Sequence, residues 1–509
     1  MASLAILGAF LLRRFSLLRV VISLAGGAVL LAQLGCSGFG PEYYLKLDQQ
    51  LFAGRFDQAD ALVAKTQEDY GAKNRVLYGM DRGATLQLLG QYDASNEAFS
   101  DAEDEIDRLF TRKLRNEALS FLLNDRELPF EGDAYEQVML NVAKALNYAL
   151  QQKWSEALVE ARRVDHRLNV IADRTSGGES SYRDDGFARY FTGLLYETAG
   201  DLNNALVAYR RAADAYAASR AYTGIGVPFG VRRDLLRTAE ALGLTSELDE
   251  YRRLYPDVGW KPVREQSDLA QVIVISYNGR APARTDEFFD VPLSLDAARL
   301  VVMSRGYGGG RQQTRAADSL LYGLNGRVVR IARPHLIAQR STVSSSQVVL
   351  SGPSGRHDTR TEPMQNITGM ADKALRERMT GLTIRASARA AIKFGIAEAV
   401  EQTLLHQARR GDGNRQRDRQ QDDLAWVAFA AGALLKTAAA ATEEADKRSW
   451  RTLPDTIHVA RLWVPPGEYQ AQIQPNGAYG AFRQVGGPSG PSLSLRAGET
   501  RVLFQRVLQ

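Results

Sequence analysis

The stretch Gly193-Leu-Leu-Tyr196-Glu-Thr-Ala-Gly200-Asp-Leu202-Asn-Asn-Ala205-Leu-Val-Ala-Tyr209-Arg-Arg-Ala212 decides how the N-terminal half of the chain folds. Apolar residues recur on both sides of Gly200 with the spacing of amphipathic helices. Glycine readily adopts the left-handed backbone that ends a helix, so Gly200 predicts a tight turn. Gly193 and Ala205 are small and let the two helices approach each other. The stretch therefore predicts a helical hairpin.

Three other segments follow the same frame. A second copy keeps nearly every position, a third keeps only the second helix, and a degenerate fourth has Gln152 where the others have glycine. The frame resembles the tetratricopeptide repeat, and Gly54 and Gly90 lie 36 residues apart, close to the period of about 34 in that family. The second copy is marked by Gly83, Leu86, Gly90, Tyr92, Ser95, Phe99 and Ala102. The third copy is marked by Gly54, Phe56, Ala59 and Val63, and the fourth by Ala145, Tyr148, Trp154, Ala157 and Ala161.

Stacked helix pairs bury apolar faces that no single pair buries alone. We therefore expect residues 36–256 to form an all-α, tetratricopeptide-like solenoid, with a capping pair around Leu235 and Leu248. Such a solenoid implies binding by its concave surface. The candidate protein-binding residues there are Gln87, Tyr190, Leu194 and Glu197, with the alternative that they only close the end of the array.

The N-terminal residues have the pattern of an export signal. Arg13, Arg14 and Arg19 precede an uncharged stretch, residues 20–34, which is short for a membrane span but suits a signal-peptide core. It ends in Leu34-Gly35-Cys36-Ser37, which resembles a bacterial lipobox, although Gln33 stands where an aliphatic residue is usual. The resemblance implies that residues 1–35 are removed, that Cys36 is lipidated, and that the protein faces the periplasm from the outer membrane. The alternative is an uncleaved anchor helix.

Residues 257–509 have the pattern of a separate α+β part. After Pro256 the apolar period changes towards two, and residues 271–277 form a continuous β-branched run that predicts a buried strand. Further strands are expected at 300–303, at 327–331 and within 457–508, whereas the serine- and glycine-rich residues 341–361 predict a loop. The Pro-Gly-Glu-Tyr phrase ending at Tyr469 resembles transthyretin-like sandwiches, so we expect a β-rich, sandwich-like part. The first strand should join the same sheet as the strand around Val459.

A helical hairpin is expected at about residues 365–445. Its second apolar stretch, residues 424–435, is too short to span a bilayer, so a buried hairpin is favoured, and insertion into a membrane is the alternative. Asp446 and Arg448 just beyond it predict an ion-paired junction between helix and sheet. Because proline interrupts the helical pattern at Pro256 and Pro262, the two halves are expected to be separable.

Composition excludes several classes of function. The single cysteine excludes a disulfide scaffold. Removing the three arginines of residues 1–35 from the formal net charge of +5 leaves +2, which gives no electrostatic case for nucleic-acid binding. The five histidines show no metal-ligand spacing, and neither a Gly-x-Ser-x-Gly elbow nor a phosphate-binding loop is present. We therefore expect no enzyme, no cofactor, no metal site and no small-molecule substrate.

The order of these parts resembles a family of uncharacterised bacterial tetratricopeptide-containing lipoproteins. The motifs that carry the resemblance are Tyr277-Asn-Gly-Arg-Ala-Pro282, Ala371-Asp-Lys-Ala-Leu-Arg-Glu-Arg378 and the segment from Ala445 to Pro454. Members are similar to proteins found beside lipoprotein activators of peptidoglycan synthases. The resemblance implies an outer-membrane lipoprotein that scaffolds a cell-envelope complex with envelope protein partners. The rival hypothesis is an accessory of an export or pore assembly whose hairpin, residues 387–445, contacts the membrane.

Overall fold

The structure is a computed structural model that describes residues 40–113, 125–175, 182, 184–292, 328–383, 444–477, 483–484 and 491–508. The predicted signal peptide with Cys36, the strand expected at 300–303 and most of the hairpin, residues 384–443, lie outside the described residues. Residues 367–383, where that hairpin was expected to begin, are helical. Within the described part, no helix combines the length and apolarity needed to cross a membrane.

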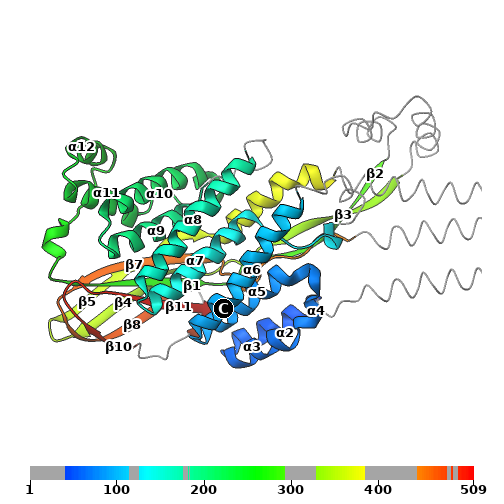
Figure 1. The fold of residues 1–509 in the computed structure, drawn as a ribbon, viewed down its shortest axis with the longest axis horizontal. Helices are drawn as coiled ribbons and strands as arrows, with labels where there is room; N and C mark the ends of the chain where they lie inside the picture. Colours follow the sequence, from blue (N-terminus) through cyan, green and yellow to red (C-terminus); the bar gives the residue numbers. More distant parts are fainter. Residues whose placement is uncertain are drawn as a thin grey trace, which may run out of the picture.

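The first half of the chain is a row of helices joined in pairs, as the glycine frame predicts (Figure 1). The helices of a pair pack on each other, and successive pairs are in contact. The helices are α2 (Pro41–Phe52), α3 (Phe56–Lys65), α4 (Gln67–Tyr70), α5 (Arg75–Leu88), α6 (Tyr92–Lys113), α7 (Ala134–Leu150), α8 (Trp154–Thr175), α9 (Gly186–Thr198), α10 (Leu202–Thr223), α11 (Phe229–Ala241) and α12 (Thr245–Leu254), with short 3₁₀ turns at Ala72–Asn74, Asp125–Glu127 and Val263–Gln266.

The turns within the pairs share one backbone device. Gly200 has φ +83°, and the amides of Gly200 and Asp201 donate to the carbonyls of Glu197 and Tyr196 at 2.9 Å, which satisfies the end of α9. Gly54, Gly90 and Gly243 also have positive φ. Gln152 holds the same place between α7 and α8 at φ 59°, so the degenerate repeat keeps its turn at the cost of a strained side-chain-bearing residue.

Small residues bring the paired helices together. A Cβ added to Gly193 would lie 2.4 Å from the Tyr209 ring, and one added to Gly83 would lie 2.4 Å from the Phe99 ring. Ala205 is fully buried. The aromatic ring of the second helix thus occupies the space that a side chain on the first helix would need.

The strands of the second half form three sheets. The strands are β1 (Ala270–Asn278), β2 (Ala283–Pro292), β3 (Val328–Ile337), β4 (Val343–Gly352), β5 (Gly355–Arg360), β6 (Glu362–Asn366), β7 (Thr456–Val464), β8 (Gly467–Gly477), β9 (Arg483–Gln484), β10 (Ser492–Leu495) and β11 (Thr500–Leu508). One sheet has the order β6-β7-β1-β11-β9, another has the order β10-β8-β4-β5, and β2 and β3 form a two-stranded ribbon. Strand β1 pairs antiparallel with β7, with Ile275 opposite Val459, which confirms that the first strand and the strand around Val459 share a sheet.

The prediction of a loop at residues 341–361 is wrong, because β4 and β5 form a hairpin there. Val348 and Leu350 are fully buried on one face of β4, and Gly355 makes the turn at φ +104°. Three consecutive serines give β4 a composition typical of a loop, and its burial comes mainly from Val348, Val349 and Leu350.

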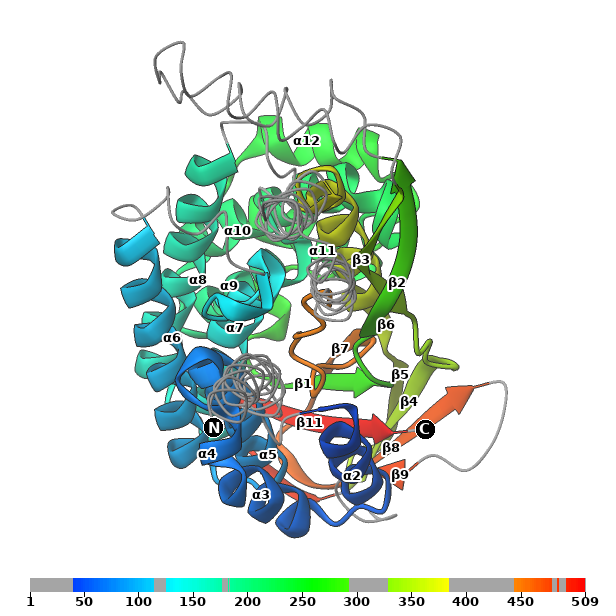
Figure 2. The ribbon, with the colours of Figure 1, turned by 90° about the vertical axis from the view of Figure 1, so that its right-hand side faces the viewer.

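The five-stranded sheet is covered on both faces. Ile273 and Ile275 belong to a core shared with the helices, whereas Val272 and Val274 belong to a core shared with β4, β8 and β10. Figure 2 shows the helices as an arc running from α3 through α6 and α8 to α12, with β1, β11 and β7 inside it. The sequence predicts that the two halves are separable. In the structure they share one hydrophobic core.

Candidate functional site

The four candidate binding residues lie on the inner face of the helical arc, where the chain's own sheet covers them. Gln87 is 5% exposed, and Tyr190 and Leu194 are each 1% exposed. The Glu197 side chain is 11% exposed and contacts Arg461 of β7. The sequence places these residues on the concave face as expected, but in this chain that face is filled by the chain's own second half. Binding of a separate protein by these four residues stays a prediction.

Arg461 ties the sheet to the helical arc through a buried ion network. Its Nη1 lies 2.5 Å from Oδ2 of Asp234 in α11, and its Nη2 lies 2.9 Å from Oε1 of Glu197 in α9. Arg237 also binds Glu197 at 2.5 Å, and Arg233 binds Asp234 at 3.1 Å. Three guanidinium groups thus surround two carboxylates in a largely buried region.

Hydroxyl groups complete this network. Tyr190 donates to Oδ2 of Asp234 at 2.9 Å, and Tyr209 donates to Oε2 of Glu197 at 2.6 Å. Burial alone would raise the pKa of Glu197, but attraction by Arg461 and Arg237 outweighs it and lowers that pKa to about 2. The pKa of Asp234 is likewise lowered, since Arg233 and Arg461 outweigh its burial. Both carboxylates are therefore ionised at neutral pH and act as structural anions.

Two other buried carboxylates, those of Asp81 and Glu136, have raised pKa values. Asp81 of α5 accepts from Tyr70 at 2.9 Å and from Thr452 at 2.9 Å, and burial raises its pKa to about 7. Glu136 of α7 accepts from the Trp450 amide at 2.7 Å, and burial with repulsion by Asp133 raises its pKa to about 7. The segment before β7 is thus held by acids of the helical arc that titrate near neutral pH.

The expected ion-paired junction at Asp446 and Arg448 is confirmed. Arg448 Nε lies 2.7 Å from Oδ1 of Asp446, and its Nη1 donates to the carbonyl of Leu128 at 2.9 Å. Arg284 of β2 pairs with Asp133, the N-terminal cap of α7. These contacts again join the two halves.

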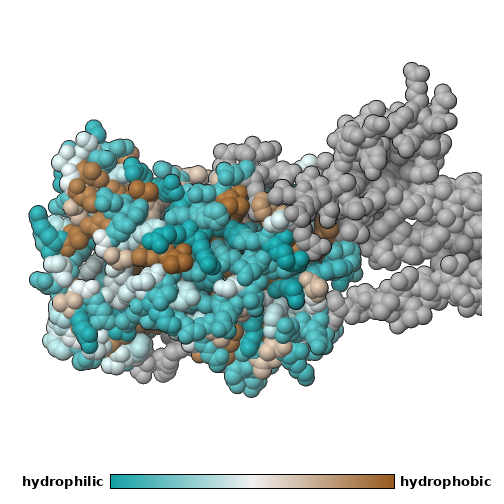
Figure 3. All heavy atoms as spheres, in the orientation of Figure 1, coloured by the Kyte–Doolittle hydropathy of each residue, from teal (hydrophilic) through white to brown (hydrophobic). Residues whose placement is uncertain are grey.

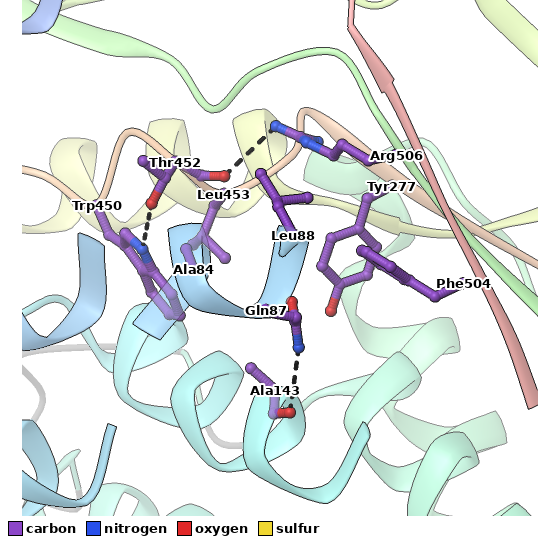
Figure 4. Close-up of a pocket in the computed structure, with 10 residues that line it drawn as sticks. All are labelled: Ala84, Gln87, Leu88, Ala143, Tyr277, Trp450, Thr452, Leu453, Phe504 and Arg506. Carbon is purple, nitrogen blue, oxygen red and sulfur yellow. Dashed lines mark hydrogen bonds between the residues drawn. The ribbon is translucent and has the colours of Figure 1, made fainter. Parts of the chain in front are cut away.

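Gln87 lines a cavity where α5 and α7 meet the sheet (Figure 4). Its Nε2 donates to Oδ1 of Asn147 at 2.7 Å. The cavity encloses about 20 Å³ and is walled by Leu88, Leu453 and Phe504, among others. Tyr277 of β1 and Arg506 of β11 also line it. This is space for a particle about the size of one water molecule.

Arg506 and Tyr277 are residues that sequence reasoning missed. Arg506 is 3% exposed and Tyr277 is 5% exposed, and Nη1 of Arg506 and Oη of Tyr277 have no hydrogen-bond partner among the residues that the structure describes. The sequence did indicate the face on which Arg506 lies, because Arg506 follows Val502 and Phe504 at the two-residue spacing of one strand face. An arginine in that register points towards a buried layer.

An open groove lies on the outer side of the arc between α5 and α6, and it measures about 670 Å³. Its floor is made of small residues, Gly79, Ala94 and Ala98, and its walls carry charged side chains. Arg82 and Arg108 of the groove are paired with Asp60 and Glu105. The exposed Glu97, Asp101, Asp104 and Arg75 form no ion pair with another described residue, so the groove keeps more unpaired acids than bases.

No group of three or more His, Cys, Asp or Glu side chains suited to hold a metal ion occurs among the residues that the structure describes. The described cavities and ion networks thus offer binding surfaces and structural charge pairs.

No protein-family model matches the chain, and no curated protein matches it. Among solved structures, the crystal structure of MamA is 15% identical, with a TM-score of 0.25, over 41% of this chain and 90% of that chain. The crystal structure of BtubC (BKLC) from P. vanneervenii is 13% identical, with a TM-score of 0.30, over 47% of this chain and 90% of that chain. Both TM-scores are low.

Proposed function

We propose that the protein is a lipid-anchored scaffold of the bacterial cell envelope that binds a partner protein through its outer groove. The observation that carries the proposal is the division of the helical arc into two surfaces. The inner face is filled by the chain's own sheet, whereas the groove between α5 and α6 is open and keeps unpaired charge.

The groove favours a basic segment of another protein. Glu97, Asp101 and Asp104 lie along one face of α6 at helical spacing, so an elongated Lys- or Arg-rich segment can follow them. The face seen in Figure 3 is mostly hydrophilic with separate hydrophobic patches, which suits recognition by charge more than by a large apolar interface. Binding should weaken as salt concentration rises.

The lipid anchor at Cys36 is a second part of the proposal. Only residues 37–40 separate that cysteine from the start of α2. Four residues span at most about 14 Å when extended, so the anchor would hold the first helix pair close to the membrane surface. Cys36→Ala should abolish palmitate labelling and release the protein from the membrane fraction. Retention of both properties by the variant contradicts the anchor.

The partner site is tested by photo-crosslinking in intact cells. A photoreactive amino acid at Asp101 should crosslink one protein through a Lys- or Arg-rich segment. The same probe at Val159, which is 46% exposed on α8, is the matched control and should not. The double variant Glu97→Lys/Asp104→Lys should lose the Asp101 crosslink without a change in unfolding. Crosslinking to the same partner from Val159, or persistence in the double variant, contradicts the groove as the binding site.

A further inference from the structure

The dipeptide Asn-Gly occurs at two places in the described part of the chain, and the two places have opposite environments. Asn278-Gly279 lies at the end of β1, and Asn476-Gly477 lies at the end of β8. A third copy, Asn325-Gly326, lies outside the described residues. An asparagine side chain that precedes glycine is open to attack by the next main-chain nitrogen, because glycine has no Cβ to shield that nitrogen.

The first dipeptide is held by hydrogen bonds on all sides. Asn278 is fully buried, its Oδ1 accepts from Oγ of Ser276 at 2.9 Å, and its main-chain carbonyl accepts from the Asp455 amide at 2.9 Å. The Gly279 amide donates to the carbonyl of Val507 at 2.9 Å. The nitrogen that would attack is therefore already bound, and ring closure would break contacts on both sides of β1.

The second dipeptide lies at the surface. Asn476 and Gly477 are both exposed, and the Asn476 side chain has no hydrogen-bond partner among the residues that the structure describes; only its main-chain carbonyl accepts, from Oγ of Ser344 at 3.2 Å. Gly477 is the last residue of β8, and the pairing of β4 with β8 shifts its register between Val343 and Ser345, opposite the dipeptide. Strand ends open locally at little cost in free energy, so Asn476 can leave the extended backbone that keeps its side chain away from the next nitrogen.

We propose that Asn476 is a site of spontaneous covalent modification, at which its side chain cyclises onto the Gly477 nitrogen and is then hydrolysed. The Gly477 nitrogen loses its proton and forms a bond to Cγ of Asn476. The bond from Cγ to the side-chain nitrogen breaks, and that nitrogen takes up a proton and leaves as ammonia. Water then opens the five-membered ring at either of its two carbonyl groups, which gives aspartate or isoaspartate without any change of oxidation state.

The modification changes both the charge and the main chain of β8. Both products carry a negative charge that asparagine lacks, and isoaspartate also routes the main chain through the side-chain carbon. The extra main-chain atom would lie beside Val343, which is buried opposite Gly477, so the pairing of β8 with β4 would end earlier in the modified protein. The proposal is independent of the scaffold function, because it concerns the sheet of β10, β8, β4 and β5 and not the groove between α5 and α6.

Tryptic digestion of the aged full chain measures both sites in one sample. Residues 462–483 and 265–280 each form one tryptic peptide with a single asparagine. The folded Cys36→Ser chain, incubated at mildly alkaline pH, should accumulate at least ten times more modification at Asn476 than at Asn278. Mass spectrometry detects the replacement of NH₂ by OH, electron-transfer fragmentation separates isoaspartate from aspartate, and an unaged sample corrects for reaction during digestion. In urea the two sites should react at similar rates, because the protection of Asn278 comes from the fold.

Gly477→Ala tests the nucleophile, since the added methyl group shields the attacking nitrogen. Modification at Asn476 should slow at least fivefold in this variant, while Asn278 should be unaffected. An unchanged rate would overturn the proposal, because direct hydrolysis by water does not use that nitrogen. Equal modification of Asn476 and Asn278 in the folded protein, or modification of Asn476 in urea only, would also overturn it, the latter by showing that pairing with β4 protects the strand end.

Discussion

Replacing Arg461 tests whether the buried ion network holds the two halves together. The Arg461 side chain is 1% exposed and gives charge-assisted hydrogen bonds to Asp234 at 2.5 Å and to Glu197 at 2.9 Å. Each such bond contributes about 1.5–3 kcal/mol, and breaking a buried pair costs about 3–5 kcal/mol. Arg233 and Arg237 remain beside the carboxylates, so we expect Arg461→Met to cost about 3 kcal/mol, near the lower end of that range.

The assay is equilibrium urea unfolding of the chain from Cys36→Ser onwards, followed by circular dichroism and tryptophan fluorescence. Arg461→Lys should be intermediate, because a single ammonium cannot bind two carboxylates in the geometry of a planar guanidinium. Arg252→Met removes an exposed pair with Asp249 and should change the free energy by less than about 1 kcal/mol. A double-mutant cycle with Glu197→Gln isolates the pair. A loss below about 0.5 kcal/mol for Arg461→Met would refute the reasoning.

Three other predictions concern packing, pH and the domain boundary. Gly193→Ala places a Cβ 2.4 Å from the Tyr209 ring and should lower the free energy of unfolding by about 1–3 kcal/mol. The control Gly259→Ala, whose Cβ would have nothing within 4 Å, should change it little. Equal melting temperatures for the two variants would contradict the helix-crossing assignment. Because burial raises the pKa of Asp81 to about 7, its stabilising effect is complete below the unfolded value of 3.8 and is lost as pH rises through 7. The free energy of unfolding should therefore fall by about 2 kcal/mol more between pH 5.5 and 7.5 in the unsubstituted protein than in Asp81→Asn, and parallel pH profiles would show that Asp81 does not titrate in this way. Residues 36–256, expected from the sequence to fold alone, should instead melt less cooperatively than the full chain, since their inner face loses the sheet; an undiminished cooperative melt would favour separable halves.

Local features of the fold were predictable because they depend on local chemistry. Glycines with positive φ end the first helix of a pair wherever the frame places them, and Gln152 was identified by its position in the frame. The apolar run at residues 271–277 indicated a strand buried on both faces, and β1 is buried at every position. The β4–β5 hairpin was missed since its serines resemble a loop composition, although Val348 and Leu350 alternate in the manner of a strand.

The joint between the halves was not predictable from the sequence. The repeat frame predicts a concave-face position for Gln87, Tyr190, Leu194 and Glu197, but helical periodicity does not tell whether that face meets another protein or the same chain. Arg461 looks like an ordinary strand residue in sequence, and the spacing of Val502, Phe504 and Arg506 indicates only which strand face Arg506 lies on. Their burial depends on pairings between residues more than 200 positions apart, such as Arg461 with Glu197.

Hydrogen exchange followed by mass spectrometry tests most directly whether the helical arc and the sheet are one folding unit. Peptides from α9 and from β1 should exchange at the same slow, cooperative rate in the unsubstituted chain, because they share a core and the Arg461 network. In Arg461→Met both sets of peptides should exchange faster and by the same factor. Fast exchange of β1 with unchanged protection of α9, in either protein, would contradict the claim that the chain fills its own concave face.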